Sequence, residues 1–416
     1  MSDADVDAPP ARALLRESDY IRFWAARFLG SLGSEIQSVT MGWQVYTLSR
    51  LTLGVGASAF NVSLIGLVTF APLFLLALPA GETADRHDRR RVMILCLAGE
   101  TIAAAALVAA NLMHFASVPL LLCVAVLFGA SRAFFSPAGT ALGPMLVPRP
   151  LLPRAIAFNS IAWQSASIVG PAIAGLLIAF SPSFGYGATL AMSLAAAVSL
   201  SLIRRRTRPA AQPGSRLTLV KEGLIYVWRN RVVFGAISLD LAAVLLGGAT
   251  ALLPAFARDV LKVGPEGFGI LRAAPALGAT CVAIYLAGHP IRRRAGLIMF
   301  AGVAVFGTAT VVFGLSKLMW LSAGALVTLG AADMLSVFVR QTLIQLATPD
   351  AMRGRVAAVS TLFISASNEL GEFESGLAAR LLGPVGAAVF GGVGAIIVTG
   401  VWARWFPALR EADRLE

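Results

Sequence analysis

Charged residues are scarce in this chain. Asp, Glu, Lys and Arg make up 13% of its 416 residues, whereas hydrophobic residues make up 57%. The mean hydropathy is +0.77. A soluble domain carries about 25% charged residues, so this composition excludes an ordinary soluble globular protein. It predicts an all-α integral membrane protein built from long apolar helices.

Cysteine and histidine are equally rare. Cys96, Cys123 and Cys281 lie within apolar runs, and we interpret them as small hydrophobic residues, not as a disulfide or metal-binding set. The three histidines fall at loop positions, which argues against a membrane-embedded enzyme, since such an enzyme needs a convergent metal or nucleophile constellation. We therefore expect no catalytic residue, no metal and no cofactor. The chain also lacks a G-x-x-x-x-G-K-[ST] phosphate-binding loop, so ATP-driven transport has no support.

Long apolar runs are abundant instead. They are 18 to 29 residues long, and a helix needs about 20 residues to cross a bilayer. We predict twelve transmembrane helices: Ile21–Tyr46, Val55–Pro79, Val92–Met113, Val118–Leu146, Ile156–Phe180, Tyr186–Ile203, Val232–Ala257, Gly267–Ala287, Gly296–Leu315, Trp320–Leu346, Val356–Leu382 and Val385–Trp405.

The basic residues are distributed unevenly among the loops. The net charge is +12, and the bases gather in alternate loops: Arg86 to Arg91, Arg149 with Arg154, the linker, Arg292 to Arg294, and Arg353 with Arg355. Short loops rich in Lys and Arg stay cytoplasmic, so we expect both termini to be cytoplasmic. We also expect the bases to meet the anionic headgroups of membrane lipids and not nucleic acid.

The two halves of the chain repeat. An offset of 201 residues lays Gly129 on Gly330, Pro148 on Pro349, Arg154 on Arg355, Gly170 on Gly371 and Gly175 on Gly376. We therefore predict two pseudo-symmetric six-helix bundles. The expected organisation is a polar cytoplasmic tail (1–18), an N-terminal half (19–203), a basic linker with an amphipathic helix (204–230), a C-terminal half (231–406) and a cytoplasmic tail (407–416).

The loop between the second and third predicted helices reads Gly81-Glu-Thr-Ala-Asp-Arg-His-Asp-Arg-Arg-Arg91. It resembles the signature of the major facilitator superfamily, G-x-x-x-D-R-x-G-R-R. Asp88 stands where that family usually has glycine, and Asp tolerates a left-handed backbone, so we expect the turn to be retained. The resemblance implies a cytoplasmic latch in which this loop packs against the inner ends of helices four and eleven. The matching residues are Gly81, Asp85, Arg86, Arg89 and Arg90.

Several further segments resemble one branch of that superfamily, the transmembrane secretion effectors that include enterobactin exporters. The segments are Val220–Asn230, Leu252–Asp259, Gly269–Pro275, Arg353–Val356 and Asn368–Gly376. This resemblance implies export of siderophores or drugs that is powered by the proton gradient.

The fifth predicted helix contains Gly170-Pro171-Ala-Ile-Ala174-Gly175, which resembles the G-P-x-x-G-G antiporter motif of facilitator exporters. Pro171 frees a backbone carbonyl, and Gly170 and Gly175 allow close helix approach. Ala174 replaces the first glycine of the closing pair. We favour the export interpretation over simple helix packing.

Charged residues within spans are costly, at about 2.5–3.5 kcal/mol each near the bilayer centre. Glu35 lies near the centre of the first helix, which in this superfamily lines the central cavity together with helices four, seven and ten. A carboxyl there could load and release a proton. The alternative is neutralisation by a fixed arginine, although Arg27, eight residues away, is about 12 Å distant along the helix.

A second acidic site lies on the eleventh helix. Glu369 and Glu372 are three residues apart and share a helix face, with Asn368 beside them. Neighbouring carboxyls do not both ionise easily, so the pair is a further candidate for proton coupling. The alternative is that Arg340 or Arg380 neutralises it.

The remaining intramembrane charges suggest structural roles. Asp240 and Arg272 lie at similar depths, and we expect them to form a pair between adjacent helices or a gate. Polar side chains that we expect in the cavity are Arg132, Asp333, Arg340 and Asn368.

The sequence as a whole favours a secondary active transporter of a bacterial-type cytoplasmic membrane that works by alternating access. We expect a monomeric, proton-coupled exporter (antiporter) of siderophores, drugs or other small amphipathic molecules. One alternative is a lipid or lysolipid carrier of the same fold. From other classes, a membrane-embedded enzyme is disfavoured by the histidine positions, and a non-transporting membrane scaffold is disfavoured by the buried charges in both halves.

Overall fold

The computed structural model describes residues 12–205, 207, 216–289, 291 and 293–411. These residues form helices, and no β-strand occurs among them. The chain divides into two compact units. Unit 1 comprises Met1–Thr40, Ala71–Ala116 and Cys123–Gly214, and unit 2 comprises Met41–Phe70, Ser117–Leu122 and Ser215–Glu416. Parts of the predicted linker (208–215) and of both tails (1–11 and 412–416), and Arg292, lie outside the described residues.

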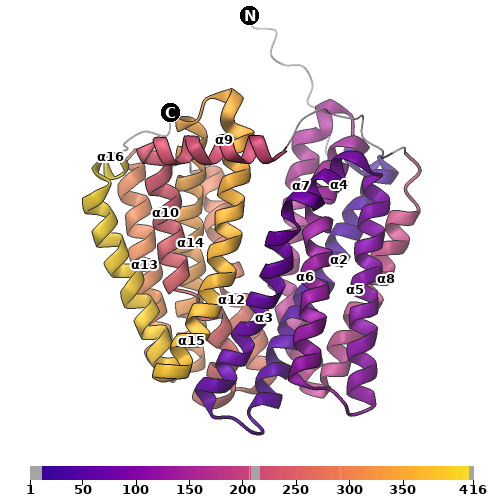
Figure 1. Cartoon of the computed structure of the whole chain (residues 1–416), viewed down its shortest axis with the longest axis vertical. Coiled ribbons are helices and arrows are strands. Elements are labelled where there is room, and N and C mark those ends of the chain that lie inside the picture. The colour runs from indigo at the N-terminus through magenta and orange to yellow at the C-terminus, as the bar shows by residue number, and fades with distance from the viewer. Residues whose placement is uncertain (1–11, 206, 208–215, 290, 292, 412–416) are drawn as a thin grey trace, which may run out of the picture. The chain divides into compact units, whose positions relative to one another are not determined.

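The elements up to the linker are α1 (Arg12–Leu15), α2 (Ser18–Ser49), α3 (Val55–Leu75), α4 (Ala77–Arg86), α5 (Arg89–Leu112), α6 (Val118–Leu142), η1 (Gly143–Leu146), η2 (Arg149–Leu151), α7 (Leu152–Phe180) and α8 (Pro182–Ser201) (Figure 1). The unit boundary crosses α2 and α3, because residues 41–70 belong to unit 2. The C-terminal part of α2 and most of α3 therefore pack within unit 2, with elements of the second half of the chain.

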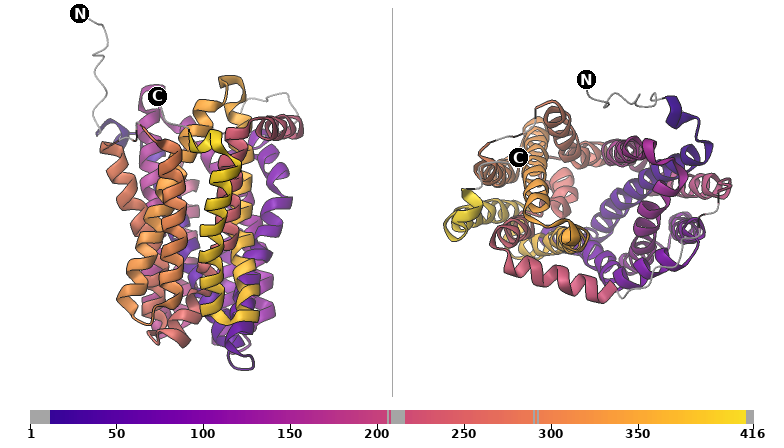
Figure 2. Two further views of the ribbon diagram at one scale, coloured as in Figure 1. Left: turned by 90° about the vertical axis from the view of Figure 1, so that its left-hand side faces the viewer. Right: turned by 90° about the horizontal axis from the view of Figure 1, so that it is seen from above.

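The elements after the linker are α9 (Arg216–Arg229), α10 (Arg231–Leu246), η3 (Ala249–Leu252), α11 (Leu253–Ala255), η4 (Phe256–Val260), α12 (Gly264–Gly288), α13 (Ala295–Leu315), α14 (Met319–Ala347), α15 (Asp350–Trp405) and α16 (Pro407–Arg410). Within unit 2, α9 lies crosswise over the ends of the upright helices (Figures 1 and 2). It is held there by an ion pair between Glu222 and Arg355. The sequence predicted an amphipathic helix in this part of the linker, and its place on a membrane surface stays a prediction.

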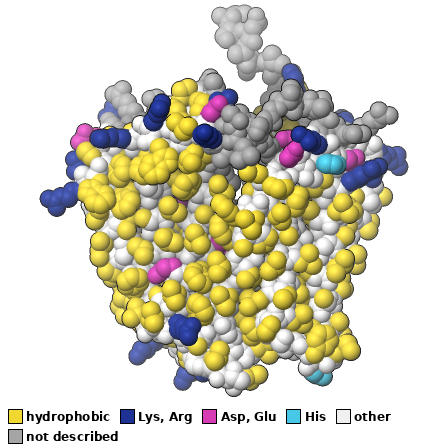
Figure 3. Space-filling model, in the orientation of Figure 1, with side chains coloured by type: hydrophobic (Ala, Val, Ile, Leu, Met, Phe, Trp, Pro, Cys, Tyr) yellow, Lys and Arg dark blue, Asp and Glu magenta, His cyan; other side chains and the backbone are white. Residues whose placement is uncertain are grey.

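The described elements are consistent with the twelve membrane helices of a facilitator-type fold. Ten elements of the described chain are long and apolar enough to cross a membrane. One of them, α15, contains two of the predicted helices, which separate at Gly383 (φ 74°) just before Pro384. The 32-residue α2 is long enough to span but more polar, since Arg27 and Glu35 interrupt it. Figure 3 shows hydrophobic side chains over most of the visible face, with Lys and Arg mainly near its upper and lower edges.

Small residues allow the helices to pack closely. In unit 2, a Cβ atom built on Gly278 of α12 would overlap the Val327 carbonyl of α14, and one on Gly330 of α14 would overlap the Pro275 carbonyl of α12. In a lipid bilayer the hydrophobic effect does not drive helices together, because lipid tails are as apolar as the side chains. Close packing of the helix backbones at small residues favours helix association instead. Larger residues fill the remaining core, with Tyr20, Phe23, Met93 and Leu97 in unit 1 and Met299, Phe300, Val339 and Leu343 in unit 2.

The predicted repeat is visible in these helix contacts. Gly170 of α7 packs against Glu35 of α2, where an added Cβ would lie 2.6 Å from the Glu35 Cβ. Its partner in the repeat, Gly371 of α15, packs against α10, where an added Cβ would lie 2.5 Å from the Val244 carbonyl oxygen. In each half, the fifth helix thus meets the first at an equivalent glycine.

The seventh predicted helix differs from the expected continuous span over Val232–Ala257. Its regular part, α10, ends at Leu246, and the chain continues through η3, α11 and the π-helical turn η4. Gly247 and Gly248 interrupt the helix at the point where Gly248 contacts the backbone of Gly371. Pro254 adds a second break, because it has no N–H to donate. Broken helices of this kind are typical of transporter cores.

The predicted loop between the second and third helices is also mostly helical. After α3 ends at Leu75, α4 contains Gly81, Asp85 and Arg86, and the non-helical link is confined to His87 and Asp88. The basic residues of the signature thus lie at the junction of two helices and not on an extended loop.

Candidate functional site

Two predicted sites of the first half lie in direct contact. Glu35 is near the middle of α2, and Gly170 and Pro171 lie within α7. The α2 helix approaches α7 so closely at Gly170 that a Cβ on this residue would collide with the Glu35 side chain. The glycine of the antiporter-like motif therefore provides the space that the Glu35 side chain occupies. Gly175 is also buried within α7.

The Glu35 side chain is half-buried, and within the described residues it forms no hydrogen bond or ion pair. Arg27, the nearest arginine along α2, is engaged elsewhere. Its guanidinium donates a hydrogen bond to Asn159 Oδ1 at 3.4 Å and lies 5.5 Å from the centre of the Phe135 ring. Neutralisation of Glu35 by Arg27, the alternative considered from sequence, does not occur in this conformation.

The predicted pairing of Asp240 with Arg272 is wrong. Asp240 of α10 pairs with Arg340 of α14, and both side chains are buried, with 9% and 2% of their surfaces exposed. The positions of Asp240 and Arg272 along their helices predict similar depths in the membrane. They do not predict the direction in which either side chain points. Arg340 was predicted as a cavity residue and instead forms half of a buried ion pair.

Arg272 of α12 lies next to Glu372 of α15, with Nη1 3.7 Å from Oε1. Glu369 and Glu372 share one face of α15, as their spacing predicted. Both carboxylates lie close to Gly66 of α3. A Cβ on Gly66 would lie 3.2 Å from Glu369 Oε2 and 3.3 Å from Glu372 Oε2. The positive charge beside Glu372 is therefore Arg272, and not Arg340 or Arg380 as considered from sequence.

The other predicted polar residues are dispersed. Arg132 of α6 is exposed, and its guanidinium lies 5.7 Å from the centre of the Phe128 ring. Asn368 is exposed on α15, and Asp333 is half-buried on α14. No group of three or more His, Cys, Asp or Glu that could hold a metal ion is found among the residues that the structure describes.

Asp88 does not adopt the left-handed backbone that we expected. It has an extended conformation (φ −62°, ψ 110°) and is the N-cap of α5, where its carboxylate accepts hydrogen bonds from the backbone amides of Arg90 and Arg91. Asp is among the preferred N-cap residues, because its oxygen satisfies amides that have no partner in the helix. Asp88 therefore replaces glycine by capping a helix and not by allowing an unusual turn.

The basic residues of the signature bind helix ends. Arg89 donates hydrogen bonds to the carbonyl oxygens of Ala84 (3.0 Å) and Ala141 (2.9 Å), and thus joins α4 to the end of α6. Arg86 forms an exposed ion pair with Glu82 at 2.8 Å. In unit 1, the signature thus contacts the C-terminal end of the fourth predicted helix, and its role as a cytoplasmic latch stays a prediction.

These features accompany a clear family match. The model of the transmembrane secretion effector family matches residues 10–416. The chain belongs to this family. Its members are membrane transporters of the major facilitator type and not enzymes.

Individual relatives fit this family. The chain is 27% identical over 381 residues to the enterobactin exporter EntS of Escherichia coli O139:H28 (strain E24377A / ETEC). The aligned region covers 90% of this chain and 88% of the relative. The same values hold for the enterobactin exporter EntS of Shigella boydii serotype 18 (strain CDC 3083-94 / BS512).

Solved structures show the same fold at low identity. A bacterial homolog of the human lysosomal transporter Spinster, in an inward-facing and unoccupied conformation, aligns with a TM-score of 0.71 at 15% identity, over 95% of this chain and 96% of that one. A D-xylose–proton symporter aligns with a TM-score of 0.70 at 12% identity, over 94% and 98%. At these identities the likeness establishes the fold alone.

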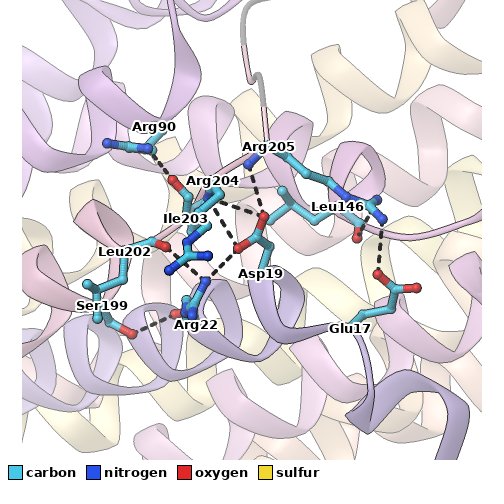
Figure 4. Close-up of polar contacts among 10 residues, drawn as sticks. All are labelled: Glu17, Asp19, Arg22, Arg90, Leu146, Ser199, Leu202, Ile203, Arg204 and Arg205. Atoms are coloured by element: carbon cyan, nitrogen blue, oxygen red, sulfur yellow. Dashed lines mark hydrogen bonds and ion pairs between the residues drawn. The ribbon is translucent and has the colours of Figure 1, made fainter.

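One buried polar centre, which is built around Asp19, was not identified from the sequence. Asp19 lies in the first turn of α2, ahead of the predicted span Ile21–Tyr46, and only 8% of its surface is exposed. Its carboxylate accepts hydrogen bonds from the backbone amides of Arg204 and Arg205 and from the Arg22 guanidinium at 2.8 Å (Figure 4). Burial alone would raise the pKa of Asp19, but these hydrogen bonds hold it below its ordinary value.

The start of the linker is fastened through the same centre. The Arg205 guanidinium binds the Leu146 carbonyl at 3.0 Å and Glu17 at 3.1 Å, and Arg90 donates to the Ile203 carbonyl (Figure 4). The ends of α2, α5, α8 and η1 are thus joined around one buried carboxylate. An Asp three residues before an Arg, just ahead of the first apolar run, was the available sequence signal.

Proposed function

We propose that this transporter is a proton-coupled exporter of small amphipathic molecules such as siderophores or drugs, and that it works by alternating access. The observation that carries the proposal is the Glu35 carboxyl, which lies half-buried in the middle of a membrane helix against the glycine of the antiporter-like motif. The enterobactin exporters among its relatives support the export direction.

The position of this carboxyl suits the proposal. It is half-buried, and no described cation pairs with it. In general, burial of a carboxyl favours its neutral form and hydration favours its charged form. A transport cycle that alternately buries and hydrates this carboxyl would couple proton binding to the change of conformation, as the proposal requires.

Close packing at Gly170 links this carboxyl to helix movement. Since α7 touches the Glu35 side chain directly, a shift of α2 relative to α7 must change the surroundings of the carboxyl. Pro171, next to the contact, lacks an N–H for the helix ladder and makes local bending of α7 easier. Gly170 and Pro171 thus act as positioning residues for Glu35 in this proposal.

The Glu369–Glu372 pair is the second candidate for the proton site. Arg272 lies beside Glu372, so this pair has a fixed charged partner that Glu35 lacks. We accordingly assign the exchangeable proton to Glu35 and a structural role to the pair.

The proposed setting is the cytoplasmic membrane of a bacterium, with both termini and α9 on the cytoplasmic side and with a monomer as the working unit. Lys221 and Trp228 are exposed on α9, which suits a helix that meets anionic headgroups. The proposed halves are 19–203 and 231–406, joined by the linker 204–230.

Transport in proteoliposomes tests this function. Purified protein would be assayed with a panel of catecholate siderophores, cationic drugs and lysolipids, with and without an imposed pH gradient. We expect uphill movement of a siderophore or drug only when the gradient is present. Movement that is indifferent to the gradient, or of lysolipid alone, would contradict the proposal.

The proton site is tested with matched variants. Glu35→Gln fixes the neutral form and should abolish gradient-driven movement while leaving downhill exchange measurable. Glu266→Gln, which removes an exposed carboxylate at the start of α12, is the control for the loss of one negative charge. If Glu35→Gln keeps full gradient-driven transport while Glu372→Gln loses it, the proton site belongs to α15.

A further inference from the structure

A cluster of three side chains connects α2 to η4 within unit 2. The Tyr46 hydroxyl donates to Asp259 Oδ2 at 2.5 Å, and the Arg50 guanidinium binds Asp259 Oδ1 at 3.2 Å. Tyr46 is fully buried, whereas the Arg50 and Asp259 side chains are 25% and 22% exposed. We call Tyr46, Arg50 and Asp259 the outer clasp, because they lie near the loop after α2 that we expect outside the membrane.

The backbone that carries Asp259 is unusual. Residues Phe256–Val260 form a π-helical turn, in which the amide of Leu261 bonds to the carbonyl of Phe256. Such turns are rare and occur frequently at functional sites. Next to Asp259, the buried Arg258 Nη1 atom has no hydrogen-bond partner among the residues that the structure describes. The π-helical turn thus carries the acidic residue of the clasp with the positive charge of Arg258 beside it.

A second contact continues from the clasp toward the middle of the membrane. Gly56 of α3 lies against the Ala379 carbonyl of α15, and Ser63 of α3 lies against Gly376, so that neither glycine has room for a Cβ. The Arg380 guanidinium also lies 5.4 Å from the centre of the Phe60 ring. We call this contact the α3–α15 seam. It ends at Gly66, beside the carboxylates of Glu369 and Glu372.

Both contacts join opposite halves of the sequence. Tyr46, Arg50 and the α3 residues come from the first two membrane helices, whereas Asp259 and α15 come from the second half. In a transporter that alternates by rocking its halves, contacts on the closed side must separate before that side opens. The seam consists of small residues and of the contact between Arg380 and the Phe60 ring, and the clasp adds an ion pair and a hydrogen bond between side chains.

We propose that Tyr46, Arg50 and Asp259 hold the α3–α15 seam closed, and that their separation is the step that admits the outer solution. Neutralising Asp259 removes the ionic contact, and removing the Tyr46 hydroxyl removes the buried hydrogen bond. Either change should raise the fraction of molecules with an open seam without altering Glu35 or Gly170. The proposal rests on the alternating access of the function proposed above but not on its proton coupling, so faster labelling in the clasp variants supports it whether or not transport follows the pH gradient.

The test measures access to the seam in whole cells. Ser63 is fully buried there, and Ser63→Cys is nearly isosteric. In full-length protein lacking Cys96, Cys123 and Cys281, this cysteine would be labelled with a membrane-impermeant maleimide. We expect Asp259→Asn and Tyr46→Phe each to speed labelling about tenfold, the change in population that corresponds to about 1.4 kcal/mol.

Three controls make the result decisive. Glu266→Gln removes a carboxylate near the same end of unit 2 outside the clasp, and should leave Ser63→Cys labelling unchanged. Ser322→Cys, equally buried but in α14, reports general loosening, and should stay unlabelled in every variant. Leu51→Cys, in the exposed loop after α2, should be labelled from outside and so confirm the side.

Three results would overturn the proposal. They are an unchanged Ser63→Cys labelling rate in both clasp variants, an equal rise at Ser322→Cys, and protection of Leu51→Cys from the external reagent. The first would show that the clasp does not hold the seam, the second that the variants only loosen the fold, and the third that the clasp is not on the outer side.

Discussion

Asp240 and Arg340 form an ion pair between α10 and α14, and each side chain is at least nine-tenths buried. Removing one partner of such a pair costs about 3–5 kcal/mol, because the other charge remains buried and unpaired. We predict that Asp240→Asn and Arg340→Gln each lower the thermal unfolding temperature of the detergent-solubilised protein substantially. The double variant Asp240→Leu/Arg340→Met should recover most of the loss, since apolar replacement of both partners is often nearly neutral.

The matched comparison is the more exposed pair of Arg272 and Glu372, which are 24% and 28% exposed and 3.7 Å apart. Arg272→Gln should shift the unfolding temperature much less than Arg340→Gln. Equal shifts for the two arginine variants would show that burial does not control the cost here.

The contact between Glu35 and Gly170 leads to a second prediction. An added methyl group at Gly170 would lie 2.6 Å from the Glu35 Cβ, so Gly170→Ala must displace α2 or α7. Overpacking of this kind costs about 1–3 kcal/mol. We expect gradient-driven transport to fall about tenfold or more. Gly187→Ala, in α8, is the control, because no atom lies within 4 Å of the site of its Cβ. Full transport by Gly170→Ala would remove this glycine from the mechanism.

The parts of the structure that could be predicted from sequence are those set by hydropathy and spacing. The run lengths gave the spans, and the three-residue spacing of Glu369 and Glu372 gave their shared face. Partners across helices could not be read in this way. Asp240 pairs with Arg340 and not Arg272, because the rotation of each helix about its axis decides which side chains meet.

Local backbone chemistry explains the other differences. Asp88 was expected to support a turn with a left-handed backbone. It is instead the N-cap of α5, where its carboxylate accepts hydrogen bonds from the backbone amides of Arg90 and Arg91. The seventh helix was expected to be continuous, because Gly247, Gly248 and Pro254 lie in an apolar run that hydropathy alone treats as unbroken. Asp19 was missed because its main partners are backbone amides 185 and 186 residues away.

Asp19 supports a prediction on stability and pH. The native pKa of Asp19 lies below its ordinary value of 3.8, so the unfolded state binds a proton more readily than the folded state. Its stabilising contribution is therefore present above about pH 4 and is lost as the pH falls further. Asp19→Asn should lower the free energy of unfolding at pH 7 by about 1.5–3 kcal/mol, the usual value for hydrogen bonds to a charged group.

The pH profile distinguishes this role from simple packing. The difference in unfolding temperature between the native protein and Asp19→Asn should shrink as the pH is lowered from 5 toward about 3. Glu17→Gln is the control, because the Glu17 carboxylate pairs with the half-exposed Arg205 guanidinium, and loss of such an exposed pair should change stability little. A difference that is constant over this range would show that ionised Asp19 is not the stabilising species.

The orientation in the membrane can be checked at two positions that the structure leaves accessible. The basic loops predict that the α13–α14 connection faces outward and that the start of α15 faces the cytoplasm. Ser316 in the first of these is only 4% exposed, so a cysteine there would be protected on either side, whereas Lys317 is exposed. At the start of α15, Gly354 has open space around it. In cells expressing a cysteine-free background, Lys317→Cys should react with an impermeant maleimide, and Gly354→Cys should react only after the membrane is opened. The reverse pattern would place the clasp of Tyr46, Arg50 and Asp259 on the cytoplasmic side and would contradict the proposed cytoplasmic position of both termini and α9.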